Sequence, residues 1–143
     1  MGPDRWNRRF PRDIAALDAI FDFVRAYVDE EGLEEGCAHD AGLVLEELFT
    51  NLVRHNRGVE AIEISLGRAG DDLLLTVRDF DVDPFDPTAR ASAAAAAVGP
   101  ADLTPGGRGI LLVRHLSKEF TYDYSDRTST LTARLDAHRE RES

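Results

Sequence analysis

The sequence predicts one α+β domain: a two-layer sandwich in which a mixed, mostly antiparallel sheet has its helices on one face. Two stretches carry apolar residues at helical spacing, residues 11–31 and 37–56. Alternating apolar residues then predict a hairpin over residues 61–79, and two more strands follow a third helix that we expect from Gly107 to about Leu116. Strands joined mostly by hairpins, with helices inserted between them, favour this class.

Each element has a recognisable pattern. Pro11 suits the first position of a helix and Gly32 its end. The apolar positions of the first helix are Ile14, Leu17, Phe21, Val24 and Val28. Those of the second helix are Ala41, Val44, Leu45, Leu48, Phe49 and Leu52. The hairpin strands alternate at Ile62, Ile64, Leu66 and at Leu73, Leu75, Val77, and the last two strands at Phe120, Tyr122, Tyr124 and at Leu131, Ala133, Leu135.

The ends and one long connection differ from the rest of the chain. We expect residues 1–10 to form a flexible arm, residues 11–136 the folded domain and residues 137–143 a polar tail. Residues 84–106 combine several prolines with an alanine tract. A connection of that length in a compact domain is typical of a lid over a functional site or of a disordered segment.

The composition excludes several classes of function. A formal net charge of −10, from 17 basic and 27 acidic residues, argues against a nucleic acid as direct partner. No apolar run approaches the roughly 20 residues that cross a bilayer, so no membrane contact is expected. Cys37 is the one cysteine, which rules out an internal disulfide and agrees with a cytoplasmic location.

Two places in the chain contain candidates for chemistry, one on the second helix and one at the end of the hairpin. Glu47 and Asn51 lie one turn apart on the second helix, at the border of its apolar face. A carboxylate there can act as general base and the amide oxygen can complete a magnesium shell, although an ordinary polar helix flank has the same pattern. Asp79 continues the inward series of Leu73, Leu75 and Val77, so it either needs a donor inside the core or caps a turn after the strand.

A glycine-rich segment, TPGGRGILLVRHL, begins the third helix. Backbone N–H groups at a helix N-terminus bind anions well when no side chains obstruct them, and Arg108 between Gly107 and Gly109 adds a positive charge. A plain helix start with flexible glycines is the alternative. The segment lacks the ending of a Walker A loop and the preceding strand of a dinucleotide fingerprint.

The order of these motifs resembles the GHKL superfamily of ATPases and kinases, whose nucleotide site is built from N, G1 and G2 boxes. Within it, the chain is most similar to the anti-sigma-factor serine/threonine kinases over about residues 11–136. The resemblance rests on EELFTNLVRHN, on the F-D-P of the segment after Asp79, and on GGRGI. It implies the GHKL fold, ATP and Mg²⁺ as cofactors, and bacterial transcription regulation by partner switching.

The resemblance also implies residue roles. Glu47 is expected to be the general base, Asn51 to coordinate Mg²⁺, and Asp79 to accept a hydrogen bond from the adenine amino group. Gly107, Arg108 and Gly109 are expected to hold the phosphates beneath the lid. Thr130 matches a threonine that supports the adenine end.

One position departs from the pattern, because the glycine of the G1 box is Asp81 in this chain. Aspartate tolerates the left-handed conformation better than most residues, so the turn is expected to survive. Its carboxylate is expected to crowd the base and to add negative charge near the polyanionic nucleotide.

The implied partners are an anti-sigma-factor antagonist with a STAS-type domain, which would be phosphorylated on serine, a sigma factor, which would be sequestered, and a second copy in a homodimer. Two other functions stay open. A catalytically weak or inactive binding module of the same fold is favoured by Asp81. The catalytic domain of a histidine kinase is disfavoured because residues 1–31 are too short for a helical hairpin with a phosphorylated histidine.

Overall fold

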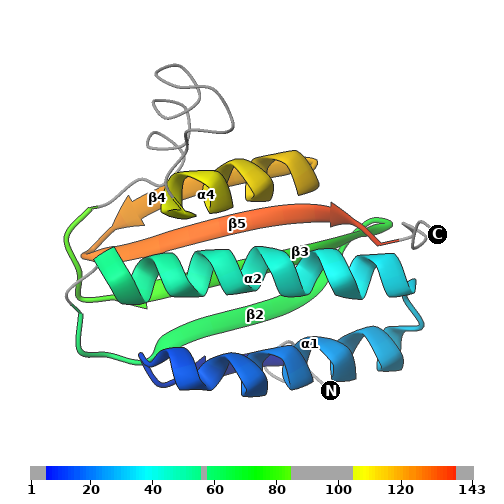
Figure 1. The fold of residues 1–143 in the computed structure, drawn as a ribbon, viewed down its shortest axis with the longest axis horizontal. Coiled ribbons are helices and arrows are strands. Elements are labelled where there is room, and N and C mark those ends of the chain that lie inside the picture. The colour runs from blue at the N-terminus through cyan, green and yellow to red at the C-terminus, as the bar shows by residue number, and fades with distance from the viewer. Residues whose placement is uncertain (1–5, 56–57, 85–104, 138–143) are drawn as a thin grey trace.

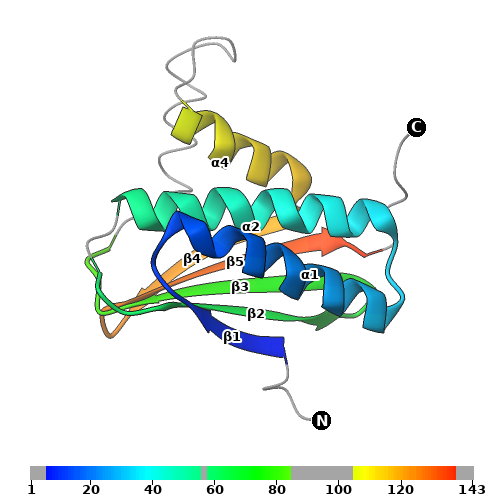
Figure 2. The same cartoon turned by 60° about the horizontal axis from the view of Figure 1, so that its bottom comes forward.

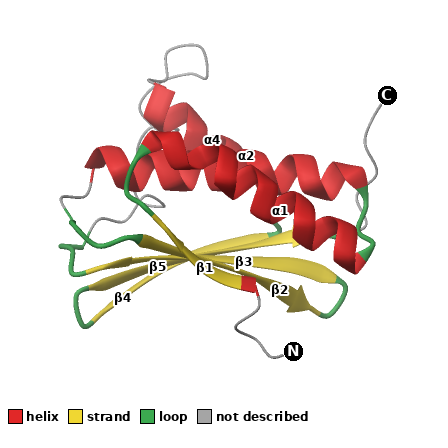
Figure 3. Ribbon diagram, turned by 90° about the horizontal axis from the view of Figure 1, so that it is seen from below, coloured by secondary structure: helices red, strands yellow, loops and turns green. Residues whose placement is uncertain are grey.

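A computed structural model describes residues 6–55, 58–84 and 105–137, and for residues 105–110 it describes the backbone alone. The described part has two layers, with the helices packed on one face of a sheet (Figure 3). Its elements in chain order are β1 (Asn7–Phe10), the short 3-10 helix η2 (Ile14–Ala16), α1 (Leu17–Glu31), α2 (Glu35–His55), β2 (Ile62–Ala69), β3 (Asp72–Phe80), α4 (Pro105–Leu116), β4 (Glu119–Ser125) and β5 (Thr128–Asp136).

The sheet has the strand order β1-β2-β3-β5-β4, so β3 lies at its centre. Every described pairing is antiparallel, whereas the sequence led us to expect a mixed, mostly antiparallel sheet. The α+β class and the placement of the helices on one face are as expected (Figure 2). The two hairpins, β2–β3 and β4–β5, give antiparallel pairs, because short turns reverse the chain direction.

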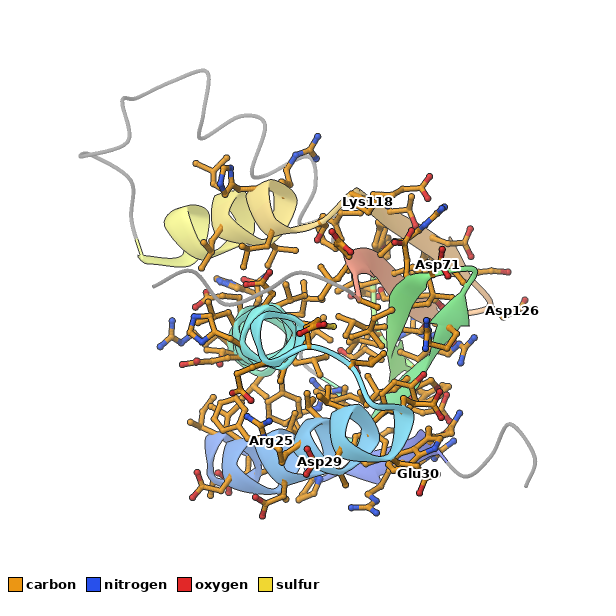
Figure 4. The ribbon with its side chains drawn as sticks, turned by 90° about the vertical axis from the view of Figure 1, so that its right-hand side faces the viewer. Arg25, Asp29, Glu30, Asp71, Lys118 and Asp126 are labelled. Carbon is orange, nitrogen blue, oxygen red and sulfur yellow. The ribbon has the colours of Figure 1, made fainter. Side chains whose placement is uncertain are left out.

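The core lies between α2 and the three inner strands. Leu73, Leu75 and Val77 of β3 are fully buried, and the register pairs them with buried residues of β5. The face of α2 that was predicted to be apolar is buried above them, from Ala41 to Leu52. Figure 4 views the domain along α2 and shows side chains filling the space between helices and sheet. Each fully buried leucine contributes about 1.5–3 kcal/mol relative to an exposed one.

The first helix begins later than predicted. Pro11 is not its first residue, because the chain makes the 3-10 turn Ile14–Ala16 before α1 starts at Leu17. Asp13 caps that turn by accepting a hydrogen bond from the N–H of Ala15 at 2.9 Å. Gly32 ends α1 as predicted, in a left-handed conformation with φ of 66°.

The expectation of a flexible arm over residues 1–10 is wrong for its last four residues. Asn7–Phe10 form β1, an edge strand paired with residues 62–65 of β2. Phe10 is 2% exposed and packs edge-on against Phe23 of α1. Trp6 contacts the ring of Phe23 at a tilt and that of Tyr27 edge-on, so aromatic packing holds this segment to the domain. Residues 1–5 lie outside the described residues.

The remaining boundaries differ by a few residues from those predicted. The second helix is Glu35–His55, and the third begins at Pro105, two residues before Gly107. Most of the predicted lid over residues 84–106 lies outside the described residues, and so do residues 138–143 of the predicted tail. Ala137, the first residue of that tail, is buried. Within the described ranges, no helix is long and apolar enough to cross a lipid bilayer.

The packing of β1 predicts that Phe10→Ala lowers the free energy of unfolding by about 3 kcal/mol, because it leaves a cavity beside Phe23. Urea unfolding would measure this loss. Phe10→Leu, which keeps most of the volume, is the matched control and should cost about 1 kcal/mol. Equal stability of Phe10→Ala and the wild-type chain would show that residues 7–10 do not dock on the sheet.

Candidate functional site

Asp79 is the centre of the candidate site. It follows Val77 at the next inward position of β3, and its side chain has no exposed surface. The guanidinium of Arg12, from the connection between β1 and η2, forms an ion pair with this carboxylate. No local pattern in the sequence predicts this partner. The one available signal was the general rule that a buried carboxylate requires a donor.

The inward neighbour of Asp79 on β5 is Ser129, and Thr130 is not. The register pairs Asp79 with Ser129 and Arg78 with Thr130. Ser129 is 1% exposed and its hydroxyl oxygen has no hydrogen-bond partner in the described structure. Because side chains alternate along a strand, Thr130 lies on the opposite face of the sheet, with Arg78 beside it. Of these two residues, Ser129 is the one that shares the inward face with Asp79.

Asn51 and Glu47 lie on α2, the helix that packs on the sheet face toward which Asp79 points. Asn51 is 5% exposed and its amide nitrogen has no partner among the described atoms. The next residue, Leu52, accepts a hydrogen bond through its backbone oxygen from Arg12 Nη1 at 3.4 Å. Arg12 thus bridges the last turns of α2, which include Asn51, to Asp79 of β3.

Glu47 lies one turn before Asn51 and is half-buried. Burial raises the pKa of its carboxyl group, the negative charge of Glu46 raises it further, and Arg54 acts in the opposite direction. A carboxylate with a raised pKa accepts protons more readily near neutral pH, which suits a general base.

Asp81 adopts the left-handed conformation that its position requires, with φ of 55°. Its carboxylate is 66% exposed and accepts a hydrogen bond from Arg127 Nε at 2.8 Å, while Arg127 Nη1 donates to Asp83 at 3.1 Å. The side chain borders solvent and its charge is compensated by an arginine, while the crowding of the base stays a prediction.

The loop after β3 is held against the β4–β5 hairpin. The N–H of Val82 donates to the Arg127 carbonyl at 3.0 Å, and the hydroxyl of Tyr124 donates to the Val82 carbonyl at 2.7 Å. Asp126 and Arg127 form the two-residue turn of that hairpin, both with positive φ. Asp126 lies on the sheet side of the molecule, away from the helices (Figure 4).

Gly107, Arg108 and Gly109 lie at the start of α4, within Pro105–Leu116. This helix runs beside α2 (Figure 1), and its Val113 is fully buried. The first N–H groups of a helix have no partners within the helix, so they can bind an anion. The side chain of Arg108 is outside the described atoms.

These positions define a class of site: a buried carboxylate and a hydroxyl at the end of two central strands, and an amide and a carboxylate on the helix above them. The chain belongs to the family of histidine kinase-like ATPase domains, whose model matches residues 10–135. The family implies a fold that binds ATP. No curated protein matches the sequence.

Solved structures have the same fold at low sequence identity. The SiaB–SiaC complex from Pseudomonas aeruginosa matches with a TM-score of 0.63 and 18% identity, over 90% of this chain and 88% of that one. The RsbU and RsbW domains of a Mycobacterium tuberculosis protein match with a TM-score of 0.64 and 16% identity, over 95% of this chain and 34% of that one. A blue-light-activated histidine kinase from Erythrobacter litoralis matches with a TM-score of 0.51 and 19% identity, over 89% and 61%.

The burial that raises the pKa of Glu47 predicts that Glu47→Gln is more stable than the wild-type chain at pH 7. The stability that the protonated form contributes is present below the unfolded pKa and is lost as the pH rises through the higher folded pKa. The difference between the two proteins should therefore shrink as the pH falls toward 4. Urea unfolding across this range would measure it.

The exposed residue Glu60 offers the matched control, since Glu60→Gln should change the free energy of unfolding by less than about 0.5 kcal/mol at every pH. A wild-type chain that is more stable than Glu47→Gln at pH 7 would contradict the assigned shift.

The exposure of Asp81 predicts that Asp81→Gly changes the affinity for ATP by less than about threefold, because its side chain borders solvent and its charge is paired with Arg127. Stability should stay within about 1 kcal/mol, since relief of the left-handed conformation offsets the loss of an exposed ion pair. Calorimetric titration and thermal unfolding would measure both quantities.

Asp83→Gly is the control for this change, because Asp83 also pairs with Arg127 but does not have a positive φ. An ATP affinity that rises tenfold or more in Asp81→Gly alone would show that Asp81 obstructs the nucleotide.

Proposed function

We propose that this chain is an anti-sigma regulatory factor that uses ATP to phosphorylate a serine or threonine of a partner protein. The observation that carries the proposal is the group of buried polar atoms with no described partner around Asp79, namely the amide nitrogen of Asn51 and the hydroxyl of Ser129. Buried polar groups are costly when unpaired, so such a group indicates a ligand.

Each residue would have a defined role. Asp79 and Ser129 would bind the base of ATP, and the start of α4, with Gly107, Arg108 and Gly109, would hold its phosphates. Asn51 would hold Mg²⁺ through its amide oxygen, the kind of ligand this ion takes. Its buried amide nitrogen has no partner among the described atoms and would donate a hydrogen bond to a phosphate oxygen. The ion would supply positive charge that neutralises the phosphate oxygens.

The transfer would need little covalent chemistry from the protein. The hydroxyl oxygen of the partner's serine attacks the γ-phosphorus, the bond from that phosphorus to the β–γ bridging oxygen breaks, and ADP leaves. Glu47 accepts the proton of the hydroxyl, in keeping with its raised pKa.

The proposed partners are suggested by the family resemblance and by the solved structures that have the same fold. The phosphate acceptor would be an anti-sigma-factor antagonist with a STAS-type domain, and a sigma factor would be bound when the antagonist is released. A structure of this fold has been solved as the SiaB–SiaC complex, and another contains an RsbW domain beside an RsbU domain, which supports partner binding by the fold. A homodimer and a cytoplasmic location belong to the same proposal.

A second candidate is a binding module of the same fold that exchanges partners without phosphate transfer. The observation that favours it is the ion pair of Asp79 with Arg12, which leaves the carboxylate without exposed surface. The charge of Asp81, which the sequence offered as support for this candidate, is compensated by Arg127.

The proposal predicts that Glu47→Gln still binds ATP but transfers phosphate to the antagonist at least about 100-fold more slowly, because the proton acceptor is lost. Mass spectrometry of the antagonist after incubation with Mg²⁺ and ATP would measure the transfer, and calorimetry would measure the binding. Glu60→Gln is the matched control, since Glu60 is an exposed carboxylate that does not lie on α2.

Normal transfer by Glu47→Gln would remove Glu47 as the base. A stable complex with the antagonist, in which the wild-type chain transfers no phosphate, would favour the binding module.

A further inference from the structure

Arg12 covers the one carboxylate that the proposed function assigns to the nucleotide base. It comes from the short connection between β1 and η2, far in sequence from β3. Its Nη2 donates to an oxygen of Asp79 and its Nη1 to the backbone oxygen of Leu52. The guanidinium therefore lies between the last turns of α2 and the end of β3.

The surroundings of Arg12 leave it little room. A Cβ atom at Gly58 would come within 2.6 Å of Arg12 Nη2 and within 2.8 Å of the Val82 side chain. Only a glycine therefore fits at position 58 while Arg12 stays in this place. Val82 is fixed in turn by hydrogen bonds from Tyr124 and to Arg127, so the loop after β3 is not free to move aside.

This arrangement leaves no path from a ligand to Asp79. The Asp79 side chain is 0% exposed, whereas the Arg12 side chain is 12% exposed and so reaches the surface. A hydrogen bond needs about 3 Å between donor and acceptor, which a carboxylate without accessible surface cannot offer to an incoming amino group. Arg12 is the group that can withdraw, because its long side chain already borders solvent.

The hydrogen bonding of Arg12 is also incomplete. Its Nε atom is buried and has no hydrogen-bond partner among the described residues. The hydroxyl of Ser129, which the register pairs with Asp79, is also buried without such a partner. An unsatisfied buried donor weakens the position of Arg12, while Ser129 offers a further contact to a group that replaces it.

We propose that Arg12 competes with the amino group of the nucleotide base for Asp79 and thereby sets the affinity of the site for ATP. ATP binds as Arg12 withdraws toward solvent, and Asp79 exchanges one donor for another. This inference rests on the proposed nucleotide site but not on phosphate transfer. The opposite arrangement, in which Arg12 stays and donates to a carbonyl of the base, would favour GTP.

The test is a calorimetric titration of the wild-type chain and of Arg12→Gln with ATP and with GTP. The neutral glutamine amide binds Asp79 more weakly than the guanidinium, so the variant should bind ATP about tenfold more tightly, with little change for GTP. Arg9→Gln is the matched control, because Arg9 is exposed and lies in β1 close to Arg12. It should leave both affinities unchanged.

Two results would overturn the inference while the nucleotide site stands. One is an Arg12→Gln variant that binds ATP no more tightly than the wild-type chain. The other is a wild-type preference for GTP that the variant loses, which would make Arg12 a direct contact of the base. If neither protein binds a nucleotide at millimolar concentration, both the inference and the proposed nucleotide site are wrong. The same conclusion holds if the wild-type chain binds no nucleotide and the variant does not fold.

A second measurement uses the native chain and does not depend on the folding of the variant. Phenylglyoxal modifies exposed arginines, and mass spectrometry of peptides reports the rate at Arg12. Arg12 should react several-fold faster with saturating ATP than without it, because it moves to solvent. A rate that stays the same or falls while ATP is bound would overturn the inference.

Discussion

The burial of the Asp79 carboxylate is the constraint on which the arrangement of the site depends. The alternation of β3 continues past Leu73, Leu75 and Val77 and places a charge where an apolar residue would otherwise complete the core. Leaving such a charge without a partner costs about 3–5 kcal/mol. Arg12 meets this requirement, and the close approach of Gly58 to its guanidinium follows from it.

The parts of the fold and site that depend on local periodicity could be predicted from the sequence. The apolar stripe of α2 and the alternation of the β2–β3 hairpin place Glu47, Asn51 and Asp79 with the correct elements and faces, because those faces are fixed by the residues that must be buried. Glycine also indicates the turn at Gly70, with φ of 63°, and the end of α1 at Gly32. Both positions need a residue in the left-handed conformation, which glycine adopts without strain.

The errors have a common origin in contacts between distant segments. The segment NRRF has no alternation of apolar and polar residues, so the pairing of β1 depends on the edge of β2 and on the packing of Phe10. Ser129, and not Thr130, is the inward neighbour of Asp79, because the pairing of β5 with the distant strand β3 sets the register and one step reverses the face. Arg12 could not be paired with Asp79 from local pattern at all.

The acidic groups of the site differ in how their charge is compensated, and this difference separates their roles. Asp79 and Asp81 are each paired with an arginine, which suits positions that fix geometry. Glu47 instead lies partly buried beside Glu46, and its pKa is raised. Carboxylates in one site whose environments push their proton affinities apart are typical of a division between holding and proton transfer. In a chain with net charge −10 and an ATPase-type fold, this compensation also limits the repulsion of a polyanion to the one carboxylate that the proposal assigns to proton transfer.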